Sequence, residues 1–445
     1  MNGSVSTMER GVDNRAVKDL LLWPGVSELL TLLNPDGEET RLVGGCVRDA
    51  LAGHPVTDID MTTTLLPEDV SRRAVAAGYR VVPTGMSHGT VTVVVDKTPF
   101  EVTTLREDVD TDGRHAEVRF GRSFEDDARR RDFTINSLSL SLDGTIHDYC
   151  GGLEHLAERR VCFIGDAERR IREDYLRILR FFRFSARFSD SVDADGLQAV
   201  IRERAGLDGL SRERICAELY KLASGPNACE MMGIVSDTGI LTQLLNGIGV
   251  LSRLRRVVEY EAHRGLAPDP VRRLAALAVL VREDAQRLRD KLRLSNDDSR
   301  RLERYARVLE RLEHRREPWS AGDVRRGFAG ENKLSDFALS GIMNVRAALE
   351  GQTGFALTKA AEVQWDAFAR GAEGKPLFPL SGRDFLGVLK PGPEIGRMLA
   401  LAREVWFEAG CPAGGDTRKE LLNRTLEKQA ISRNFEECRP PAGPH

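Results

Sequence analysis

Residues 41–62 read RLVGGCVRDALAGHPVTDIDMT, and the rest of the chain is organised around this stretch. It ends with two acids, Asp58 and Asp60, one residue apart. Because side chains of a strand alternate between its faces, both carboxylates point the same way and Ile59 points into the core. Two carboxylates on one face repel each other unless a cation lies between them. A turn whose acids lie in solvent is the alternative.

The Gly44-Gly45 pair lies between the end of an apolar strand and a short helix over residues 46–52. This arrangement presents backbone N–H groups with no side chain in the way, which suits phosphate oxygens. Arg48 lies one turn into the helix, and its guanidinium can donate two charge-assisted hydrogen bonds to the same anion. An ordinary tight turn is the alternative. Beside the acidic pair, however, such an anion site would meet the needs of a metal–nucleotide complex.

Length and composition indicate a globular protein of about three domains. The 445 residues are 41% hydrophobic and 30% charged, and the net charge of -3 neither favours nor excludes nucleic acid. The seven cysteines show neither a Cys-x-x-Cys pair nor zinc-type spacing, so we expect a reducing compartment and no structural metal. The sequence shows no signal or transit peptide and no run of 18 apolar residues. We therefore expect a cytoplasmic protein with no membrane partner.

The first third of the chain is rich in strand signals. Two β-branched runs, 90–96 and 100–106, predict a hairpin. Glu101, on the second run, either reaches the acidic pair as a third carboxylate or is an exposed strand residue. Residues 16–33 predict two helices separated at Pro24. Residues 107–123 are polar and charged, which predicts a mobile loop that closes over a substrate.

Residues 127–152 begin with three arginines ahead of an amphipathic stretch. A solvated helix start is one interpretation. However, Asp132 and Asn136 form a polar cluster within an apolar run, which a mere surface would not need. Arg131 and Asp132 are therefore candidates for contacts to ribose or phosphate.

Residues 168–188, ERRIREDYLRILRFFRFSARF, predict one continuous helix. Arg177, Arg180 and Arg183 recur every third residue from Asp174, so they follow a ridge that winds around this helix. An exposed helix with internal ion pairs is the alternative.

Three motifs occur in a familiar order and spacing, namely LVGGCVRDALAGHPVTDIDMTT, RRRDFTINSL and REDYLRILRFFRF. They closely resemble those of the class II tRNA nucleotidyltransferases, the CCA-adding enzymes that share their head with bacterial poly(A) polymerases. FEVTTLR, the Asp112-Gly113-Arg114 loop and LSRERICAELYKL (210–222) are similar to the remaining elements of that family. The specific resemblance covers residues 40–225, and a weaker one covers the segment from PLFPLSGRDF to LAREVW near the C-terminus.

The resemblance implies a role for each matching residue. Asp58 and Asp60 would hold catalytic Mg²⁺, and Glu101 stays a further catalytic candidate from its place on the second strand run. Nucleotide binding would fall to Gly44, Gly45, Arg48, Arg131, Asp132, Glu173, Asp174, Arg177, Arg180 and Arg183. Ser137 departs from the alanine that is usual in the family, and Ser211, Glu213 and Arg214 match its neck-stabilising motif.

The resemblance also implies an α+β fold with a polymerase β-like nucleotidyltransferase head on a mixed β-sheet. We expect this head over residues 1–152, a helical neck with the base-recognition helix over 153–225, a body over 226–320 and a tail over 321–445. Body and tail would bind tRNA. The implied activity is template-independent addition of CCA to tRNA from CTP and ATP, with release of pyrophosphate.

Base choice without a template follows from the hydrogen-bonding groups of the bases. Cytosine and adenine each offer an amino donor beside a ring-nitrogen acceptor, whereas guanine and uracil offer a carbonyl beside an N–H. A carboxylate next to a guanidinium therefore fits C and A and leaves buried groups unpaired against G and U. Asp174 and Arg177 are the expected pair.

Rival functions stay open at this point. The same head serves poly(A) polymerases and enzymes that add only CC or only A, and a catalytically silent RNA-binding protein belongs to another class. Between Arg253 and Arg316 there are 18 Lys/Arg against 11 Asp/Glu. This excess suits an RNA backbone, with ordinary solvated helix faces as the alternative. We expect no DNA partner.

Overall fold

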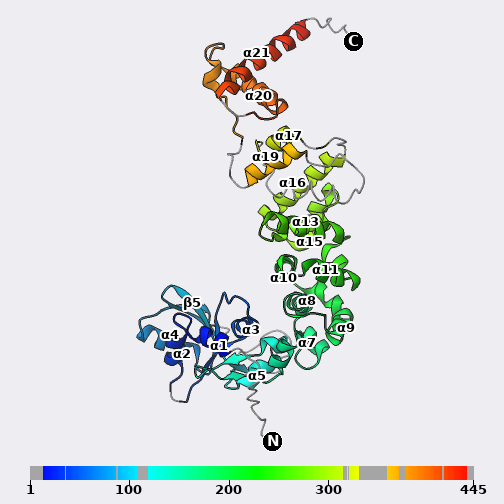
Figure 1. The fold of residues 1–445 in the computed structure, drawn as a ribbon. Helices are drawn as coiled ribbons and strands as arrows, with labels where there is room; N and C mark the ends of the chain where they lie inside the picture. The colour runs from blue at the N-terminus through cyan, green and yellow to red at the C-terminus, as the bar shows by residue number, and fades with distance from the viewer. Residues whose placement is uncertain are drawn as a thin grey trace. The chain divides into compact units, whose positions relative to one another are not determined.

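The computed structural model describes residues 14–313, 318, 320–329, 358–369, 376–412 and 415–437, except for residues 36, 87–88 and 108–118. The chain divides into two compact units, residues 1–240 and 241–445 (Figure 1). The ranges predicted for head and neck, residues 1–152 and 153–225, both lie within the first unit. The Asp112-Gly113-Arg114 loop lies outside the described residues.

The head is built on a seven-stranded sheet in the order β3-β4-β5-β2-β1-β8-β9. Strands β2 and β5 are parallel and all other neighbours are antiparallel, so the sheet is mixed, as predicted. Its strands are β1 (Thr40–Val43), β2 (Asp60–Thr63), β3 (Arg80–Gly85), β4 (Thr90–Val95), β5 (Thr98–Thr104), β8 (Ser139–Leu140) and β9 (Ile146–His147). A separate two-stranded sheet joins β6 (Arg106–Glu107) to β7 (Arg119–Phe120).

The predicted hairpin is confirmed as β4 and β5. Its turn residues, Asp96 and Lys97, have φ values of 46° and 71°. Two-residue turns with both central residues in the left-handed region match the right-handed twist of the strands, which fixes the register. That register sets Thr92 opposite Glu101, and the parallel pairing sets Asp60 on the other side of Glu101.

Helices of the head bury their apolar faces against this sheet in one core. Leu29, Leu30 and Val70 are fully or almost fully buried there with Val91 and Val93 of β4. The helices of the head are α1 (Asn14–Leu21), α2 (Val26–Leu33), α3 (Gly45–Leu51), α4 (Pro67–Ala76), α5 (Phe124–Arg129) and α6 (Gly152–Ala157), with a 3₁₀-helix, η2, at Thr134–Asn136. The break at Pro24 is confirmed.

The single helix predicted over residues 168–188 is wrong, because the segment forms two helices. They are α7 (Ala167–Glu173) and α8 (Arg177–Phe188). Asp174 is extended, with φ −154° and ψ 104°, and its Oδ1 accepts the backbone N–H of Leu176 at 3.1 Å. A short acidic side chain competes for backbone N–H groups in this way, so aspartate favours helix ends over interiors.

The rest of the first unit is helical. Its further elements are α9 (Ala194–Glu203), the 3₁₀-helix η3 (Arg204–Gly209), α10 (Arg212–Ser224), α11 (Ala228–Asp237) and the start of α12 (Ile240–Leu245). Ser211 caps α10, since its side chain accepts the backbone N–H of Arg214 at 3.3 Å. Such a cap stabilises a helix by about 1 kcal/mol.

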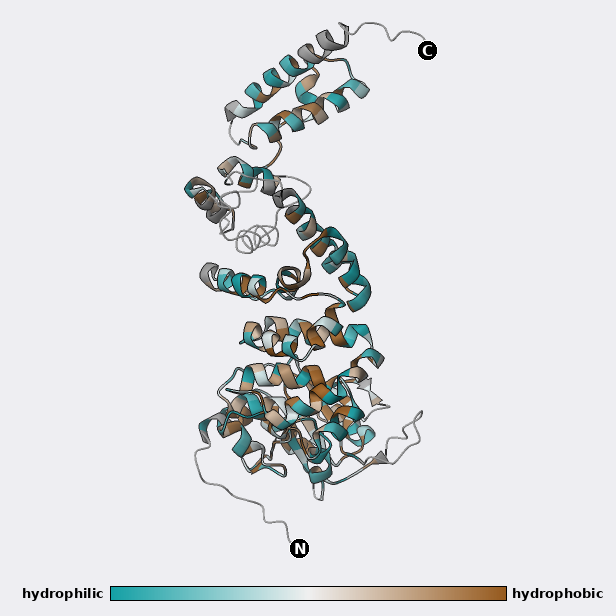
Figure 2. Cartoon of the chain, turned by 90° about the vertical axis from the view of Figure 1, so that its right-hand side faces the viewer, coloured by the Kyte–Doolittle hydropathy of each residue, from teal (hydrophilic) through white to brown (hydrophobic). Residues whose placement is uncertain are grey.

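The described part of the second unit is also helical. Its elements are α13 (Leu251–Arg264), α14 (Pro270–Ala278), α15 (Arg282–Leu292), α16 (Asn296–Glu313), α17 (Ala321–Ala329), α19 (Lys359–Ala369), the 3₁₀-helix η5 (Gly382–Phe385), α20 (Pro393–Glu408) and α21 (Gly415–Glu437). Hydrophobic and hydrophilic residues are interspersed along its helices (Figure 2). Within the described ranges, no helix is both long and apolar enough to cross a bilayer.

Part of the basic excess between residues 253 and 316 is internal. Glu261 forms ion pairs with Arg272 at 2.9 Å and with Arg273 at 2.8 Å, and all three side chains are buried. Arg253 is buried too and donates to the carbonyl of Val279 at 3.0 Å. These arginines hold the body together and are not available to an RNA backbone.

Candidate active site

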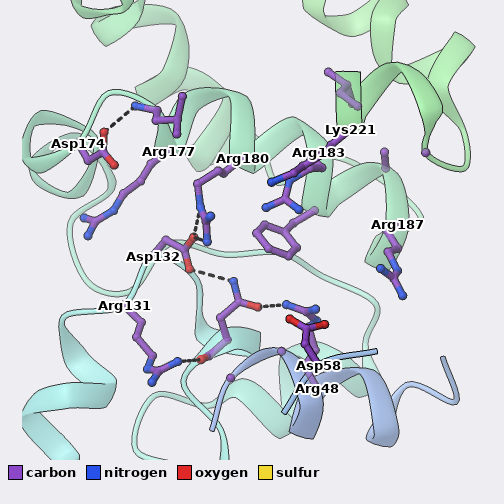
Figure 3. A pocket seen from close by; sticks show the side chains of 18 of the residues that line it. Arg48, Asp58, Arg131, Asp132, Asp174, Arg177, Arg180, Arg183, Arg187 and Lys221 are labelled. Carbon is purple, nitrogen blue, oxygen red and sulfur yellow. Dashed lines mark hydrogen bonds and ion pairs between the residues drawn. The ribbon is translucent and has the colours of Figure 1, made fainter. Parts of the chain in front are cut away.

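A cavity of about 800 Å³ opens in the first unit between the sheet of the head and the neck helices α8 and α10. It brings together eleven of the predicted site residues, whereas Glu101 and Glu173 are not among its lining residues. Those eleven are Gly44, Gly45, Arg48, Asp58, Asp60, Arg131, Asp132, Asp174, Arg177, Arg180 and Arg183. Residues more than a hundred positions apart in the sequence thus face one space (Figure 3).

The glycine turn lines the cavity, and the N–H of Gly44 already donates to the carbonyl of Leu138 at 2.9 Å. Gly44 has φ 69°, a conformation that favours glycine, and a Cβ there would lie 2.6 Å from Nη1 of Arg131. A Cβ on Gly45 would meet only Nη2 of Arg48, at 3.8 Å. Helix α3 begins at Gly45, so the N–H groups at its start lack acceptors within the helix.

Arg48 is held in one orientation from several sides. Nε and Nη2 donate to Oδ1 of Asp49 at 2.9 and 2.8 Å, and Nη1 donates to Oδ1 of Asn136. The guanidinium also lies 4.9 Å from the ring centre of Phe184 and 4.5 Å from that of Phe188. Burial lowers the pKa of Arg48. A buried cation fixed this way is ready to bind an anion without reorganising.

The acidic pair lies at the edge of the cavity, where β2 begins. Ile59 is 5% exposed while Asp58 and Asp60 both line the cavity, as predicted, but the strand expected to carry all three begins only at Asp60. Burial, followed by the negative charges of Asp58 and Glu101, raises the pKa of Asp60 to about 6 against the lowering effect of Arg131. Asp60 is therefore a carboxylate whose charge the protein alone leaves poorly neutralised.

The donor set of this pair fits magnesium. Carboxylate oxygens are the hard ligands that Mg²⁺ prefers, and Mg²⁺ commonly takes one or two carboxylates together with waters and phosphate oxygens. Among the described residues, no group of three His, Cys, Asp or Glu side chains is placed to hold a metal ion. Glu101 is exposed and lies opposite Asp60 in the parallel pairing of β2 and β5, and its charge raises the pKa of Asp60.

Asp132 forms the centre of a buried polar network. Its Oδ2 accepts from Nε of Arg180 at 2.7 Å, and its Oδ1 accepts from Nδ2 of Asn136 at 2.9 Å and from the N–H of Phe133 at 2.9 Å. These hydrogen bonds and the charge of Arg180 keep the pKa of Asp132 low despite burial. Since the same Asn136 accepts from Arg48, the network links two of the cavity's arginines (Figure 3).

Arg131 borders the cavity beside the glycine turn. Its Nη2 lies 3.1 Å from Oδ2 of the buried Asp127, and its Nη1 donates to the carbonyl of Asn136 at 3.3 Å. The guanidinium keeps its position relative to Gly44 through these two contacts.

Asp174 and Arg177, the two residues expected to read the base, each have another ion-pair partner. Asp174 Oδ2 lies 2.8 Å from Nη2 of Arg214, on α10. Arg177 instead forms an ion pair with Glu173 at 2.6 Å and donates to the carbonyl of Arg170 at 2.7 Å. Asp174, Arg177 and Arg214 all line the cavity, so a base edge there meets one carboxylate and two guanidinium groups.

Arg183 lies further along α8 and forms a 2.7 Å ion pair with Glu218 of α10, whose side chain is 5% exposed. This contact joins the two neck helices. Sequence reasoning missed two further cations that line the cavity, Arg187 and Lys221. Their helical spacing, four residues after Arg183 and seven after Arg214, was the available signal.

Comparison with known proteins identifies the family. The mouse protein named CCA tRNA nucleotidyltransferase 1, mitochondrial is 34% identical over 416 residues, which covers 91% of this chain and 91% of the mouse protein. This chain belongs to the CCA tRNA nucleotidyltransferase family. The family model described as the poly A polymerase head domain matches residues 40–162 of this nucleotidyltransferase.

Two bacterial relatives are similar over different lengths. The CCA-adding enzyme of Geobacillus thermodenitrificans is 39% identical over 234 residues, which cover 52% of this chain and 57% of that enzyme. The crystal structure of the Bacillus stearothermophilus CCA-adding enzyme in complex with CTP superposes with a TM-score of 0.66 at 26% identity. It covers 91% of this chain and 98% of that chain, so the predicted fold class is confirmed for this nucleotidyltransferase.

Proposed function

We propose that this protein adds C, C and A to the 3′ end of tRNA from CTP and ATP. The observation that carries the proposal is the single cavity that joins an acidic pair, a glycine phosphate cradle and a carboxylate flanked by guanidinium groups. The family to which the chain belongs is named for this activity.

The residues divide the work of nucleotidyl transfer. Asp58 and Asp60 would hold Mg²⁺, which when bound neutralises phosphate charge and favours ionisation of the attacking hydroxyl. The backbone at Gly45, where a Cβ would meet only Arg48, and the fixed guanidinium of Arg48 bind the triphosphate oxygens. Positioning and charge neutralisation suffice for this reaction, so no side-chain nucleophile is needed.

In the reaction, one bond to the α-phosphorus of the nucleotide forms and another breaks. The 3′-hydroxyl oxygen of the RNA forms a bond to that phosphorus, and its proton passes to solvent. The bond between the α-phosphorus and the bridging oxygen breaks, and pyrophosphate leaves with the electron pair. Asp132 acts as a positioning residue, because its carboxylate oxygens are engaged by Arg180, Asn136 and Phe133.

The base is read at the other end of the cavity. Asp174 accepts from the amino group of cytosine or adenine, and a guanidinium donates to the adjacent ring nitrogen. Uracil and guanine set a carbonyl against the carboxylate and leave both groups unpaired. The 2.8 Å contact with Arg214 supports this role, since it fixes Asp174 without a base present.

The proposal also assigns a function to each of four parts of the chain. Residues 1–152 act as head, 153–225 as neck, and 226–320 and 321–445 as tRNA-binding body and tail. The exposed Arg300 and the half-buried Arg304 of α16 support contact with an RNA backbone. A cytoplasmic location stays a prediction, because several relatives carry the word mitochondrial in their names.

Stepwise incorporation tests the proposal. Purified protein is incubated with tRNA ending before the first C, after C, or after CC, and with labelled CTP or ATP supplied alone. We expect C to be added to the first two substrates and A to the third. A long A tail on any substrate identifies a poly(A) polymerase, restriction to one nucleotide identifies a CC-only or A-only enzyme, and no extension identifies a silent RNA-binding protein.

A further inference from the structure

Arg187 of α8 and Lys221 of α10 line one end of the cavity. Neither has been assigned to metal, triphosphate or base binding. In Figure 3 they lie on the right-hand side of the view, whereas Asp174 and Arg177 lie on the left. Arg177 and Arg187 are ten residues apart on one helix, so the cationic wall extends about 15 Å along α8. The wall is therefore longer than base recognition alone requires.

The other guanidinium groups of the cavity already have close carboxylate partners. Each of these arginines lies between 2.6 and 3.1 Å from a carboxylate oxygen. Arg187 is 3.6 Å from Asp49, and that carboxylate is closer to Arg48. Lys221 is 3.3 Å from Glu218, which is closer to Arg183. The charges of Arg187 and Lys221 are thus the least neutralised in the cavity.

Both cations are accessible and come from anchored helices. Their side chains are 38% and 57% exposed, so an incoming anion can reach them. The Arg183–Glu218 ion pair ties α8 to α10 between them, and the Arg187 guanidinium lies 5.2 Å from the ring centre of Phe188. Two held, solvent-facing cations on one wall suit an anionic group that bridges the two helices.

The ligand follows from what the cavity already binds. The triphosphate has its own cradle at Gly44-Gly45 and Arg48, and the base is read at Asp174. The remaining reactant is the RNA end. Its phosphodiesters carry negative charge, which would neutralise Arg187 and Lys221. We infer that Arg187 and Lys221 bind a phosphodiester next to the reacting 3′-hydroxyl of the tRNA, an assignment that rests on the proposed function.

Equilibrium binding of each reactant alone tests this assignment. The Kd of tRNA lacking CCA and the Kd of CTP with Mg²⁺ are measured for wild type, Arg187→Ala, Lys221→Ala and the double variant. Arg202→Ala is the matched control, because Arg202 is 65% exposed, forms an ion pair with Glu168 and lies outside the cavity. We expect the Kd of tRNA to rise about tenfold for each single variant, as for loss of a charge-assisted hydrogen bond. The Kd of CTP should stay within about twofold of wild type, because the triphosphate binds elsewhere.

Salt dependence and charge rescue separate a phosphate contact from a structural role. Each lost contact should lower the slope of log Kd against log salt by about 0.7, as for single-stranded nucleic acid. Arg187→Lys and Lys221→Arg should keep that slope. A weaker Kd for CTP with an unchanged Kd for tRNA would overturn the assignment in favour of the triphosphate, and unchanged values for both would overturn it outright. If wild type binds CTP but not tRNA, the proposed function fails as well. If wild type extends tRNA and the variants bind tRNA as tightly as wild type does, this inference alone fails.

Discussion

Arg214 forms a 2.8 Å ion pair with Asp174, forty residues earlier in the chain. The second oxygen of the same carboxylate accepts the backbone N–H of Leu176 at 3.1 Å. Asp174 is therefore held from both sides before any nucleotide binds. The orientation of Asp174 thus depends on α10 as well as on the segment that joins α7 to α8.

Arg214→Ala should relax nucleotide choice, because Asp174 then loses the group that fixes its orientation. We expect the preference for CTP and ATP over UTP and GTP to fall by about ten- to a hundredfold, the scale of one mispaired buried polar group. The kcat/KM of all four nucleotides measures this directly. Asp174→Ala should relax the choice at least as far, and Arg202→Ala should leave it at the wild-type value. Unchanged discrimination in Arg214→Ala would remove α10 from base selection.

The two glycines of the cradle should respond differently to alanine. Gly44→Ala places a Cβ at φ 69° and 2.6 Å from Arg131, so it should cost about 1–2 kcal/mol of stability as well as nucleotide affinity. Gly45→Ala meets only Arg48 at 3.8 Å, so it should melt like wild type while its Kd for CTP rises. Thermal melting and CTP titration of both variants check this. Tight CTP binding by Gly45→Ala would mean that phosphate does not approach this backbone.

Asp132→Asn should destabilise the protein, because it leaves the charge of Arg180 without its carboxylate in a buried network. Because the side chain of Arg180 is 33% exposed, the loss should be about 1–2 kcal/mol, less than for a fully buried pair. Asp132→Asn with Arg180→Met should recover much of that loss in denaturant unfolding while catalysis stays impaired. A double variant no more stable than the single one contradicts this account of the network.

Acid unfolding gives a second measure of the same carboxylate. The pKa of Asp132 is lowered in the folded protein, so its stabilising effect is present above the ordinary aspartate pKa and is lost as the pH falls through the lowered value. Asp132→Asn should therefore lose less stability than wild type between neutral and acidic pH.

Asp60→Asn should stabilise the metal-free protein at neutral pH. The folded-state pKa of Asp60 is raised from 3.8 to about 6, so folding favours its protonated form and stability falls as the pH rises across that interval. Asn lacks this cost, which is on the order of 1–2 kcal/mol after allowance for solvent screening. We expect a higher Tm for Asp60→Asn in EDTA at pH 7.5, with the gain vanishing near pH 4. Glu101→Gln should give a smaller gain, because the charge of Glu101 is the weaker cause; equal gains at both pH values would contradict this explanation.

Much of the head could be predicted from local sequence. The strand, glycine pair and acidic pair of residues 41–62 fold as expected because their periodicity and turn residues act over a few positions. The hairpin of β4 and β5 is predictable for the same reason. The family motifs also predicted eleven lining residues of the cavity, although their individual roles stay predictions.

The neck could not be predicted as well, because its contacts depend on tertiary packing. Helical propensity favours one helix through Asp174, and only the partner on α10 and the local N–H contact explain the break there. A pairing of Asp174 with Arg177 follows from sequence spacing, yet spacing within one segment carries no information on Arg214. The buried Glu261 cluster likewise shows that counts of basic residues overstate the charge a surface presents.

The most direct test of the central claim is sequencing of product ends. tRNA lacking CCA is incubated with Mg²⁺ and equal concentrations of all four nucleotides, with wild-type protein and with Asp58→Ala as a folded, inactive control. The account predicts that wild-type products end in CCA and stop there, and that Asp58→Ala adds nothing. Products with U or G in these positions, homopolymer tails, or wild-type activity in Asp58→Ala would contradict it.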